Sequence, residues 1–459
     1  MHVHLIAPAR IEPLGLKGKA SVAPPMALAI LAGLSPADVE ISLTDENVSS
    51  LDWDTPADLV GISSTTRTAP RAYEIADGYR SRGIKVVLGG MHVSALPEEA
   101  AAHADAVVVG EAEGLWPQVL ADAQAGRLQP LYQAREYPTL AALPLPRRDL
   151  FQRERYAIAD TLYTTRGCPY GCSFCSVTTF FGGRYRSRPV EDVVAEVEAM
   201  GRPGLVGFLD DNIAANPRRA KSLFRALAPY NMSWLGQADL TIARDEELLA
   251  TLAASGCKML LIGIETLSAT NLDTVGKRPN SPDKYEEAIR RIHAHGIGVF
   301  GAFLLGLDDD GEDVFERTLQ FARRVHLEGA QFNIPTPYPG TPLYEEMERE
   351  GRITNRNWAD YSCDQVVFEP RRLSARRLQE GHDWVWREFY SLDSTWERIG
   401  LSHPDLLLMW LINLNYRDDW IAHLVLRPLM AVAERVYRVS NGSPTPAADA
   451  ALRPRGEAQ

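Results

Sequence analysis

The sequence contains few cysteines and no excess of basic residues. Only 5 of its 459 residues are cysteine, an odd number, whereas a disulfide framework in a secreted domain uses dense, paired cysteines. Lys and Arg together number 48 against 60 Asp and Glu, which gives a net charge of -12. A protein that binds a phosphate backbone usually carries a basic excess. We therefore expect neither a disulfide scaffold nor a nucleic acid partner.

Long apolar runs are also absent. The most apolar stretch, residues 406–414, is far shorter than the ~20 residues that a membrane-spanning helix needs. Residues 1–8 show no basic region followed by an apolar core, which a secretion signal requires. We expect a cytoplasmic protein without a transmembrane span. Burial of the apolar run in a helical core is the favoured interpretation, and contact with a membrane surface stays open.

Short apolar runs alternate with amphipathic stretches in the first 126 residues. This pattern predicts an α/β domain with a Rossmann-like parallel sheet. The expected strands are residues 3–6, 39–43, 59–63, 86–88 and 106–109. Ligands of such sheets bind beyond the carboxyl ends of the strands. The candidate ligand-binding loops are therefore Ser63-Ser64-Thr65, Gly89-Gly90-Met91-His92 and Gly110-Glu111-Ala112-Glu113-Gly114.

A second α/β series follows a proline-rich segment that reads as a linker. Its expected strands are residues 161–165, 206–209, 233–237, 259–264, 299–305 and 331–335. Six such units predict a partial (β/α)6 barrel, because a complete barrel has eight. Helical periodicity follows, with a tail that is expected to be disordered. The predicted divisions are a first domain 1–130, a linker 131–155, the barrel 156–365, a helical domain 366–440 and the tail 441–459.

Three cysteines share one short loop after a predicted strand. Cys168, Cys172 and Cys175 have the spacing C-x3-C-x2-C. Three thiolates can hold three irons of a 4Fe-4S cubane and leave the fourth iron open, whereas electron-transfer clusters use four cysteines. The alternative is a zinc site, but this needs a fourth Cys or His nearby, and none follows before residue 185. The spacing therefore predicts a 4Fe-4S cluster, with Cys257 and Cys363 as bystanders.

The cysteine motif, with Phe174 just before its last cysteine, resembles the radical S-adenosylmethionine (SAM) superfamily. The resemblance implies that the open iron binds SAM. Besides Phe174, it implies SAM contacts at the ends of three later strands: Asp210, Asp211, Gln237 and Glu265. Glu265 would bind the ribose, and the region of Asp210 would face the methionine end. For each polar contact, the alternative is a side chain satisfied by nearby backbone.

With an α/β domain ahead of the barrel, the whole chain resembles the cobalamin-binding radical SAM enzymes. The first loop, residues 8–10, carries no Asp-x-His-x-x-Gly segment, so cobalamin would bind base-off without a histidine from that loop. A loop histidine such as His92 is more often solvated than in contact with the corrin. The cobalamin contacts that the resemblance implies are Ser63, Ser64, Thr65, Gly89, Gly90, His92, Gly110, Glu111 and Glu113.

The resemblance implies methylation of an unactivated carbon in a small-molecule substrate: a secondary metabolite, a lipid or a tetrapyrrole. One SAM would supply a 5′-deoxyadenosyl radical and a second would remethylate cobalamin, with a flavodoxin or ferredoxin as electron donor. A cobalamin-dependent radical cyclisation, oxidoreduction or rearrangement uses the same motifs and stays open. A methylthiotransferase of transfer RNA is disfavoured, because no cysteine cluster precedes Cys168. A non-catalytic cobalamin sensor would leave the three cysteines without a purpose.

Overall fold

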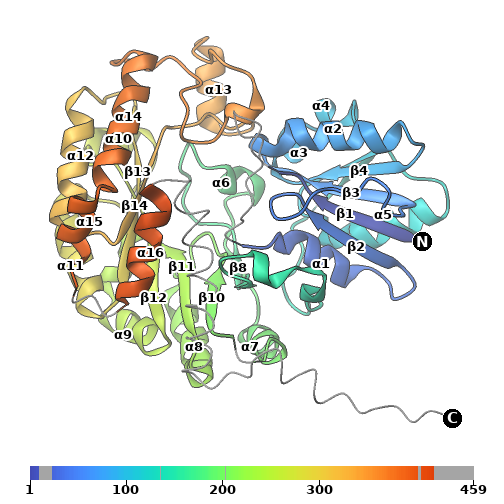
Figure 1. Cartoon of the computed structure of the whole chain (residues 1–459), viewed down its shortest axis with the longest axis horizontal. Helices are drawn as coiled ribbons and strands as arrows, with labels where there is room; N and C mark the ends of the chain where they lie inside the picture. Colours follow the sequence, from blue (N-terminus) through green and yellow to red (C-terminus); the bar gives the residue numbers. More distant parts are fainter. Residues whose placement is uncertain (10–22, 135, 202, 402–404, 418–459) are drawn as a thin grey trace.

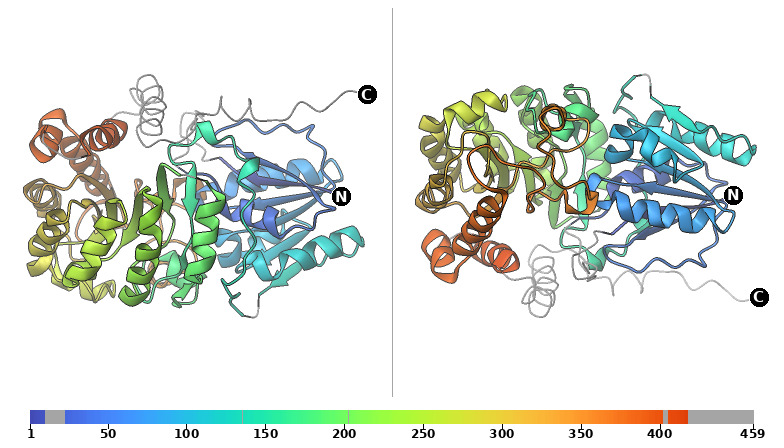
Figure 2. Two further views of the ribbon diagram at one scale, coloured as in Figure 1. Left: turned by 90° about the horizontal axis from the view of Figure 1, so that it is seen from below. Right: turned by 90° about the horizontal axis from the view of Figure 1, so that it is seen from above.

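Two parallel sheets organise the chain. The structure is a computed structural model that describes residues 1–9, 23–134, 136–201, 203–401 and 405–417. The two sheets lie side by side in all views, and the segments between their strands form helices (Figures 1 and 2). The predicted α/β fold class is confirmed: a Rossmann-like N-terminal sheet, a second parallel sheet and C-terminal helices.

The first sheet has the order β2-β1-β3-β4-β5-β6, and neighbouring strands are parallel. Its strands are β1 (His2–Ala7), β2 (Glu40–Asp45), β3 (Leu59–Ser63), β4 (Lys85–Gly89), β5 (Ala106–Val109) and β6 (Leu131–Gln133). The first five confirm the predicted strands. The last was not predicted, because it lies in the range that we assigned to the linker. It pairs with β5, so the first residues of that range belong to the first sheet.

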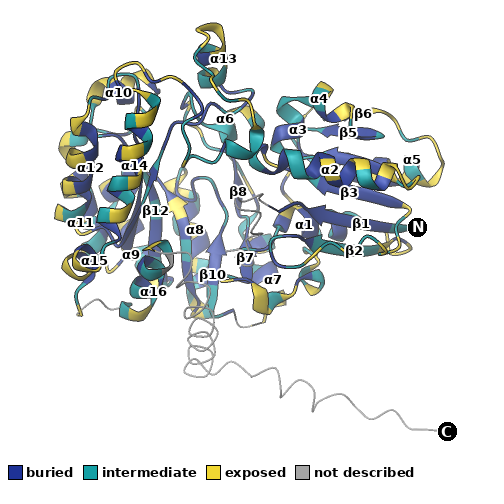
Figure 3. Ribbon diagram, turned by 45° about the horizontal axis from the view of Figure 1, so that its top comes forward, coloured by how far each residue is buried: buried dark blue, intermediate teal, exposed yellow. Residues whose placement is uncertain are grey.

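Helices bury both faces of the first sheet. One face packs against α1 (Met26–Leu34) and α5 (Trp116–Gln124). The other packs against α2 (Ala69–Arg80) and α3 (Met91–Ala95), which is followed by α4 (Pro97–Ala101). Successive strand residues point to opposite faces, so a strand that is covered on both sides is apolar throughout. Figure 3 shows the central strands β1, β3, β4 and β5 as mostly buried and the outer faces of the helices as exposed.

The second sheet has the order β14-β13-β12-β11-β10-β7 and is also parallel. Its strands confirm the six predicted ones: β7 (Asp160–Leu162), β10 (Leu205–Phe208), β11 (Ser233–Ala238), β12 (Cys257–Glu265), β13 (Gly298–Leu304) and β14 (Gly329–Asn333). The connecting helices include α7 (Val190–Ala199), α8 (Pro217–Leu227), α9 (Glu246–Ala254), α10 (Ala269–Thr274), α11 (Tyr285–Ala294), α12 (Asp313–Arg324) and α13 (Pro342–Arg349). The sheet therefore has six strands rather than the eight of a complete barrel.

A short antiparallel hairpin was not predicted. Its strands β8 (Thr165–Arg166) and β9 (Arg186–Ser187) enclose the cysteine loop and α6 (Ser176–Phe180). Two residues a strand are too few to show a period of two in the sequence, so the pattern gave no signal. In Figure 1, α6 lies between the two sheets.

The C-terminal helices are α14 (Ala375–Phe389), α15 (Leu392–Ile399) and α16 (Leu406–Arg417). The apolar run 406–414 forms most of α16, and its Met409 is buried in one cluster with Met259 and Phe300 of the second sheet. One side of this run therefore packs on the core, with Met409 and Leu411 buried, whereas Leu407 is 61% exposed. No helix among the described residues is long and apolar enough to cross a membrane. The predicted disordered tail, 441–459, lies outside the described residues.

A substitution of Gly90 tests the close packing between the ends of β3 and β4 in the first sheet. Its φ is +104°, and a Cβ on it would lie 2.4 Å from the carbonyl oxygen of Ser64. We expect Gly90→Ala to lower the free energy of unfolding by about 2–4 kcal/mol, since strain and overpacking add. Gly114→Ala is the matched control, because a Cβ there meets nothing within 4 Å. Urea unfolding followed by circular dichroism measures both, and equal effects would contradict the expectation.

Candidate active site between the two sheets

The three cysteines lie together on the loop between β8 and α6. All are free thiols, Cys172 buried and the other two partly exposed. Burial is the main cause that raises the pKa of Cys172 to about 11; Lys277 opposes the rise, and Cys175 and Cys168 add to it. The thiols are thus within electrostatic reach of one another, as the ligands of a three-cysteine cluster must be. Among the described residues, no three His, Cys, Asp or Glu side chains converge on a point that a single metal ion could occupy.

Asp210 is hydrogen-bonded to the segment that leads into the cysteine loop. Its side chain accepts hydrogen bonds from the backbone N of Thr164 at 3.1 Å, from Thr164 Oγ1 at 2.7 Å and from Thr165 Oγ1 at 2.5 Å. It is fully buried, and burial raises its pKa while these hydrogen bonds oppose the rise. The chain's own donors thus contact both oxygens of Asp210, and the expectation that the Asp210 region faces the methionine end of SAM stays a prediction.

Asp211 and Asn212 continue this support. The Oδ2 atom of Asp211 accepts a hydrogen bond of 2.9 Å from the backbone N of Gly167. Burial raises the pKa of Asp211 to about 6, and the bond to Gly167 opposes the rise. Asn212 was missed in the sequence: its Nδ2 lies 3.9 Å from the sulfur of Cys168 and donates to Asp239 at 2.7 Å. No spacing rule marks such a residue, because it reaches the loop through the fold alone.

Glu265 ends β12 in a left-handed conformation with φ +66°. Its Oε1 accepts a hydrogen bond of 2.8 Å from the ammonium of Lys277. Burial lowers the pKa of Lys277, but the charges of Glu265 and Cys172 outweigh it and the pKa is raised. The structure thus places a buried cation beside the cysteines, and the sequence gave no signal for it, because a single Lys in a loop matches no pattern.

The other two predicted SAM contacts lie at the same end of the second sheet. Gln237 is an exposed residue near the carboxyl end of β11. Phe174 is half-buried and packs against Val275, Leu304 and Leu307. Phe174 belongs to the cysteine loop itself, between Cys172 and Cys175, and contact of Phe174 and Gln237 with SAM stays a prediction.

The predicted loops of the first sheet face the cysteine loop from the other side. Ser64 Oγ is buried and has no hydrogen-bond partner among the residues that the structure describes. Thr65 instead caps a short turn through Thr68. The backbone N of Gly110, at φ +86°, donates to Ser94 Oγ at 2.9 Å. A buried, unsatisfied hydroxyl at a strand end, beside glycine backbone, fits a loop that receives a polar ligand.

His92 is buried rather than solvated. Its Nε2 lies 3.2 Å from Glu99 Oε1, and its ring packs edge-on against Trp358 with 5.3 Å between centroids. Glu99 also accepts a hydrogen bond of 3.0 Å from Trp358 Nε1. Burial lowers the pKa of His92, while the bond to Glu99 opposes this. Since Trp358 follows the second sheet in the chain, His92 belongs to a contact between the two halves of the molecule.

Glu111 and Glu113 are ion-paired to the hairpin β8–β9. Glu111 contacts both Arg166 and Arg186, and Glu113 contacts Arg166. Guanidinium groups of the chain thus pair with both carboxylates, and contact of Glu111 and Glu113 with cobalamin stays a prediction. Nothing in the sequence distinguishes a carboxylate that binds a cofactor from one that binds a distant arginine.

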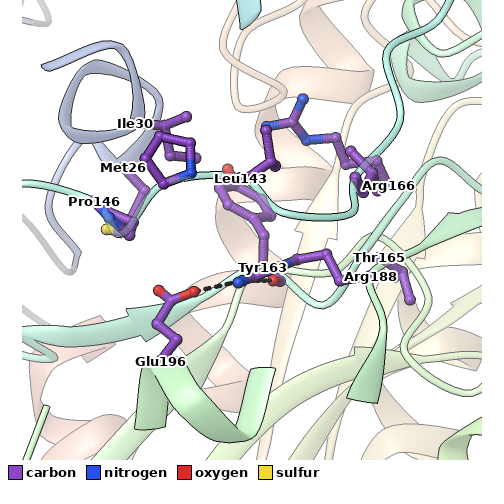
Figure 4. A pocket seen from close by; sticks show the side chains of 11 residues that line it. Met26, Ile30, Leu143, Pro146, Tyr163, Thr165, Arg166, Arg188 and Glu196 are labelled. Carbon is purple, nitrogen blue, oxygen red and sulfur yellow. Dashed lines mark hydrogen bonds and ion pairs between the residues drawn. The ribbon is translucent and has the colours of Figure 1, made fainter. Parts of the chain in front are cut away.

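A cavity of about 270 Å³ lies between the two halves. Gly110 and Glu111 of the first sheet line one side, and Ser176 and Phe180 of α6 line the other. A smaller cavity of about 20 Å³, room for about one water, lies beside Tyr163. At its edge Glu196 is paired with Arg188 (Figure 4). Only the larger cavity has the size to receive part of a cofactor.

Two family models match the chain over these regions. The radical SAM superfamily matches residues 162–322, and the B12 binding domain matches residues 20–120. Bacteriochlorophyllide d C-8(2)-methyltransferase of Chlorobaculum tepidum is 33% identical, covering 87% of this chain and 92% of that protein. The C-12(1)-methyltransferase of the same organism is 29% identical, covering 86% and 88%. Hopanoid C-2 methylase of Rhodopseudomonas palustris is 27% identical, covering 78% and 72%.

Solved structures share the fold. TsrM from Kitasatospora setae, a radical SAM methyltransferase with cobalamin and a [4Fe-4S] cluster bound, superposes with a TM-score of 0.66 at 17% identity, covering 96% of this chain and 100% of that chain. The chain therefore belongs to the B12-binding radical SAM enzymes. Within them it is a cobalamin-dependent radical SAM C-methyltransferase, with a 4Fe-4S cluster, SAM and cobalamin as cofactors. The alternative of a non-catalytic sensor is thereby wrong, and methyl transfer is favoured over cyclisation.

The cysteine assignment is tested by two matched substitutions. Cys172→Ala removes one of three thiolates, so we expect reconstituted protein to lose most of its iron, its cluster absorbance and its formation of 5′-deoxyadenosine. Cys257→Ala removes a buried thiol at the start of β12, outside the loop. This variant should keep its iron, its cluster absorbance and its formation of 5′-deoxyadenosine. Iron analysis and chromatography of the nucleoside measure the outcome. A Cys172→Ala protein with full iron content would contradict the assignment.

Asp210→Asn tests the support of the cysteine loop. The amide presents two N–H donors where the structure has only donors pointing at it, so we expect a loss of about 2–4 kcal/mol in the free energy of unfolding. Asp273→Asn, on the exposed side of α10, should change it by less than about 0.5 kcal/mol. Denaturant unfolding of the metal-free proteins measures both variants. Equal stability of the two would show that Asp210 does not bear on the loop.

Proposed function

We propose that the protein transfers a methyl group to a carbon of a tetrapyrrole side chain. The observation that carries this proposal is the match to two bacteriochlorophyllide d methyltransferases over nearly their whole length. The hopanoid methylase is less similar and is covered less completely, so a lipid substrate is the second candidate. The substrate is in either case a small molecule with an unactivated carbon.

The proposed ligands of the cluster are Cys168, Cys172 and Cys175. When bound, the cluster and SAM supply the radical that removes a hydrogen atom from the substrate carbon, and cobalamin supplies the methyl group. Asp210 and Asp211 hold the loop that carries the cysteines. Lys277 and Glu265 place a positive and a negative charge beside it, which suits the recognition of a zwitterionic cofactor such as SAM. Gln237 and Phe174 border the same space.

The proposed cobalamin site is the cavity between the sheets. Its support is the position of the cavity beyond the strand ends, with Gly110 in its lining. At a neighbouring strand end, the unsatisfied Ser64 hydroxyl lies beside the backbone of Gly89 and Gly90. Ser63 flanks this site, and Thr65 helps to shape it as a cap. The domain divisions 1–130, 131–155, 156–365 and 366–440 stay a proposal, with β6 moved to the first domain.

The proposed partner is a one-electron donor of the flavodoxin or ferredoxin kind. Pro169 and Gly171 expose the tip of the cysteine loop, and a Cβ on Gly171 would meet nothing within 4 Å. The adjoining surface carries the exposed Arg278 and Arg244, which suit an acidic partner. The proposed location is the cytoplasm, where reducing conditions keep such thiols free.

Labelled methyl transfer tests the proposed substrate. The anaerobically reconstituted protein receives SAM with a trideuterated methyl group and either a bacteriochlorophyllide or a hopanoid. We expect mass spectrometry to find all three deuterons in the bacteriochlorophyllide, with equal amounts of S-adenosylhomocysteine and 5′-deoxyadenosine, because one SAM serves each half of the reaction. Labelling of the hopanoid alone would replace the proposed substrate by a lipid. Deoxyadenosine without S-adenosylhomocysteine would indicate cyclisation or rearrangement instead.

A further inference from the structure

Four charged side chains join the first sheet to the hairpin that carries the cysteine loop. We call Glu111, Glu113, Arg166 and Arg186 the carboxylate clamp. The Nη1 atom of Arg166 lies 2.5 Å from Glu111 Oε2, its Nη2 pairs with Glu113, and Arg186 pairs with the second oxygen of Glu111. The side chains of Glu111 and Arg166 are only 2% and 9% exposed. The pairs are thus largely removed from water, where removal of one partner is costly.

The carboxylate clamp binds both strands of the hairpin at one position of the ladder. Arg166 and Arg186 are direct partners across the β8–β9 ladder, and Glu111 bridges the two. The clamp also reaches the segment after the first sheet: Arg186 donates to the carbonyl of Pro138 at 2.9 Å and lies over the ring of Tyr137. One carboxylate therefore fixes the hairpin, the linker and the first sheet relative to one another.

The clamp is close to the cysteine loop at both of its ends. Arg166 precedes Gly167 and Cys168, and Gly167 is so tightly enclosed that a Cβ on it would lie 2.1 Å from the carbonyl oxygen of Arg184. After Cys175 the chain enters α6, whose Ser176 lines the same cavity as Glu111. A shift at Glu111 would therefore move the loop that carries the thiols and one wall of the cavity together.

We propose that the carboxylate clamp sets the position of the cluster loop relative to the first domain, with Glu111 as the main positioning residue. Glu111 acts through its ion pairs with Arg166 and Arg186. Neutralising Glu111 removes the carboxylate that pairs with Arg186 and leaves Arg166 paired with Glu113 alone, so the hairpin opens more often while both sheets stay folded. The proposal holds for any methyl acceptor and does not depend on a tetrapyrrole substrate.

The experiment uses holoenzyme of Glu111→Gln, Glu113→Gln and the control Glu196→Gln. Glu196 is the matched control because it is also a buried carboxylate between two arginines, Arg148 and Arg188, but none of its ion pairs in the described part of the chain involves the first sheet or the loops that follow its strands. Pulsed electron paramagnetic resonance measures the distance between the reduced cluster and cob(II)alamin in protein without substrate. Hydrogen–deuterium exchange measures the opening of residues 165–187.

We expect Glu111→Gln to widen the distribution of cluster-to-cobalt distances about twofold and to speed amide exchange in residues 165–187 about tenfold or more, with the strands of both sheets unchanged. Glu113→Gln removes the pair with only one arginine, so it should widen the distance distribution and speed the exchange by smaller factors. This variant tests the proposal if Glu111→Gln does not fold. Glu196→Gln should leave the distance distribution as in the wild type. An unchanged distribution in both clamp variants, or an equal change in the control, would overturn the proposal.

Discussion

The ion pairs of Glu111 with Arg166 and Arg186 connect the two halves of the molecule where the cysteine loop begins. Each sheet is parallel, so its loops for ligands gather at its carboxyl edge, and the two edges face one another across the cavity. The carboxylates come from one sheet and the guanidinium groups from the hairpin beside the other. Their charges are compensated only when the halves are docked, which makes the geometry of the active site a property of the junction.

Around the cysteine loop, acidic side chains divide into two kinds. Asp210 and Asp211 accept hydrogen bonds from the loop and its preceding strand, and so they hold the loop. Glu265 is instead paired with Lys277, whose ammonium group lies within electrostatic reach of the thiol of Cys172. A radical enzyme relies on its cofactors for bond breaking, so the protein acts mainly by holding them at fixed positions. The extensive hydrogen bonding of this loop serves that requirement.

Strand positions could be predicted because their cause is local. The strands of both sheets are covered on two faces, and this burial demands continuous apolar runs that are visible in the sequence. The cysteine spacing is local in the same sense, since all three thiols sit on one loop. The short hairpin β8–β9 and strand β6 were missed because strands of two or three residues are too short to show the alternation of apolar and polar residues. Lys277 and Asn212 were missed because they reach the thiols from separate loops.

The partners of the buried carboxylates could not be predicted from the sequence. Asp210, Glu111 and Glu113 follow strands at the ligand-binding edge, so their positions could be predicted, yet each is occupied by donors from elsewhere in the chain. The sequence by itself determined the two α/β halves and the three-cysteine loop, because these depend on short-range spacing, and SAM and cobalamin were implied by the family resemblance that these motifs carry. Only the tertiary structure decided which charges face each other, because a buried charge takes its partner from whatever segment the fold brings within a few ångströms.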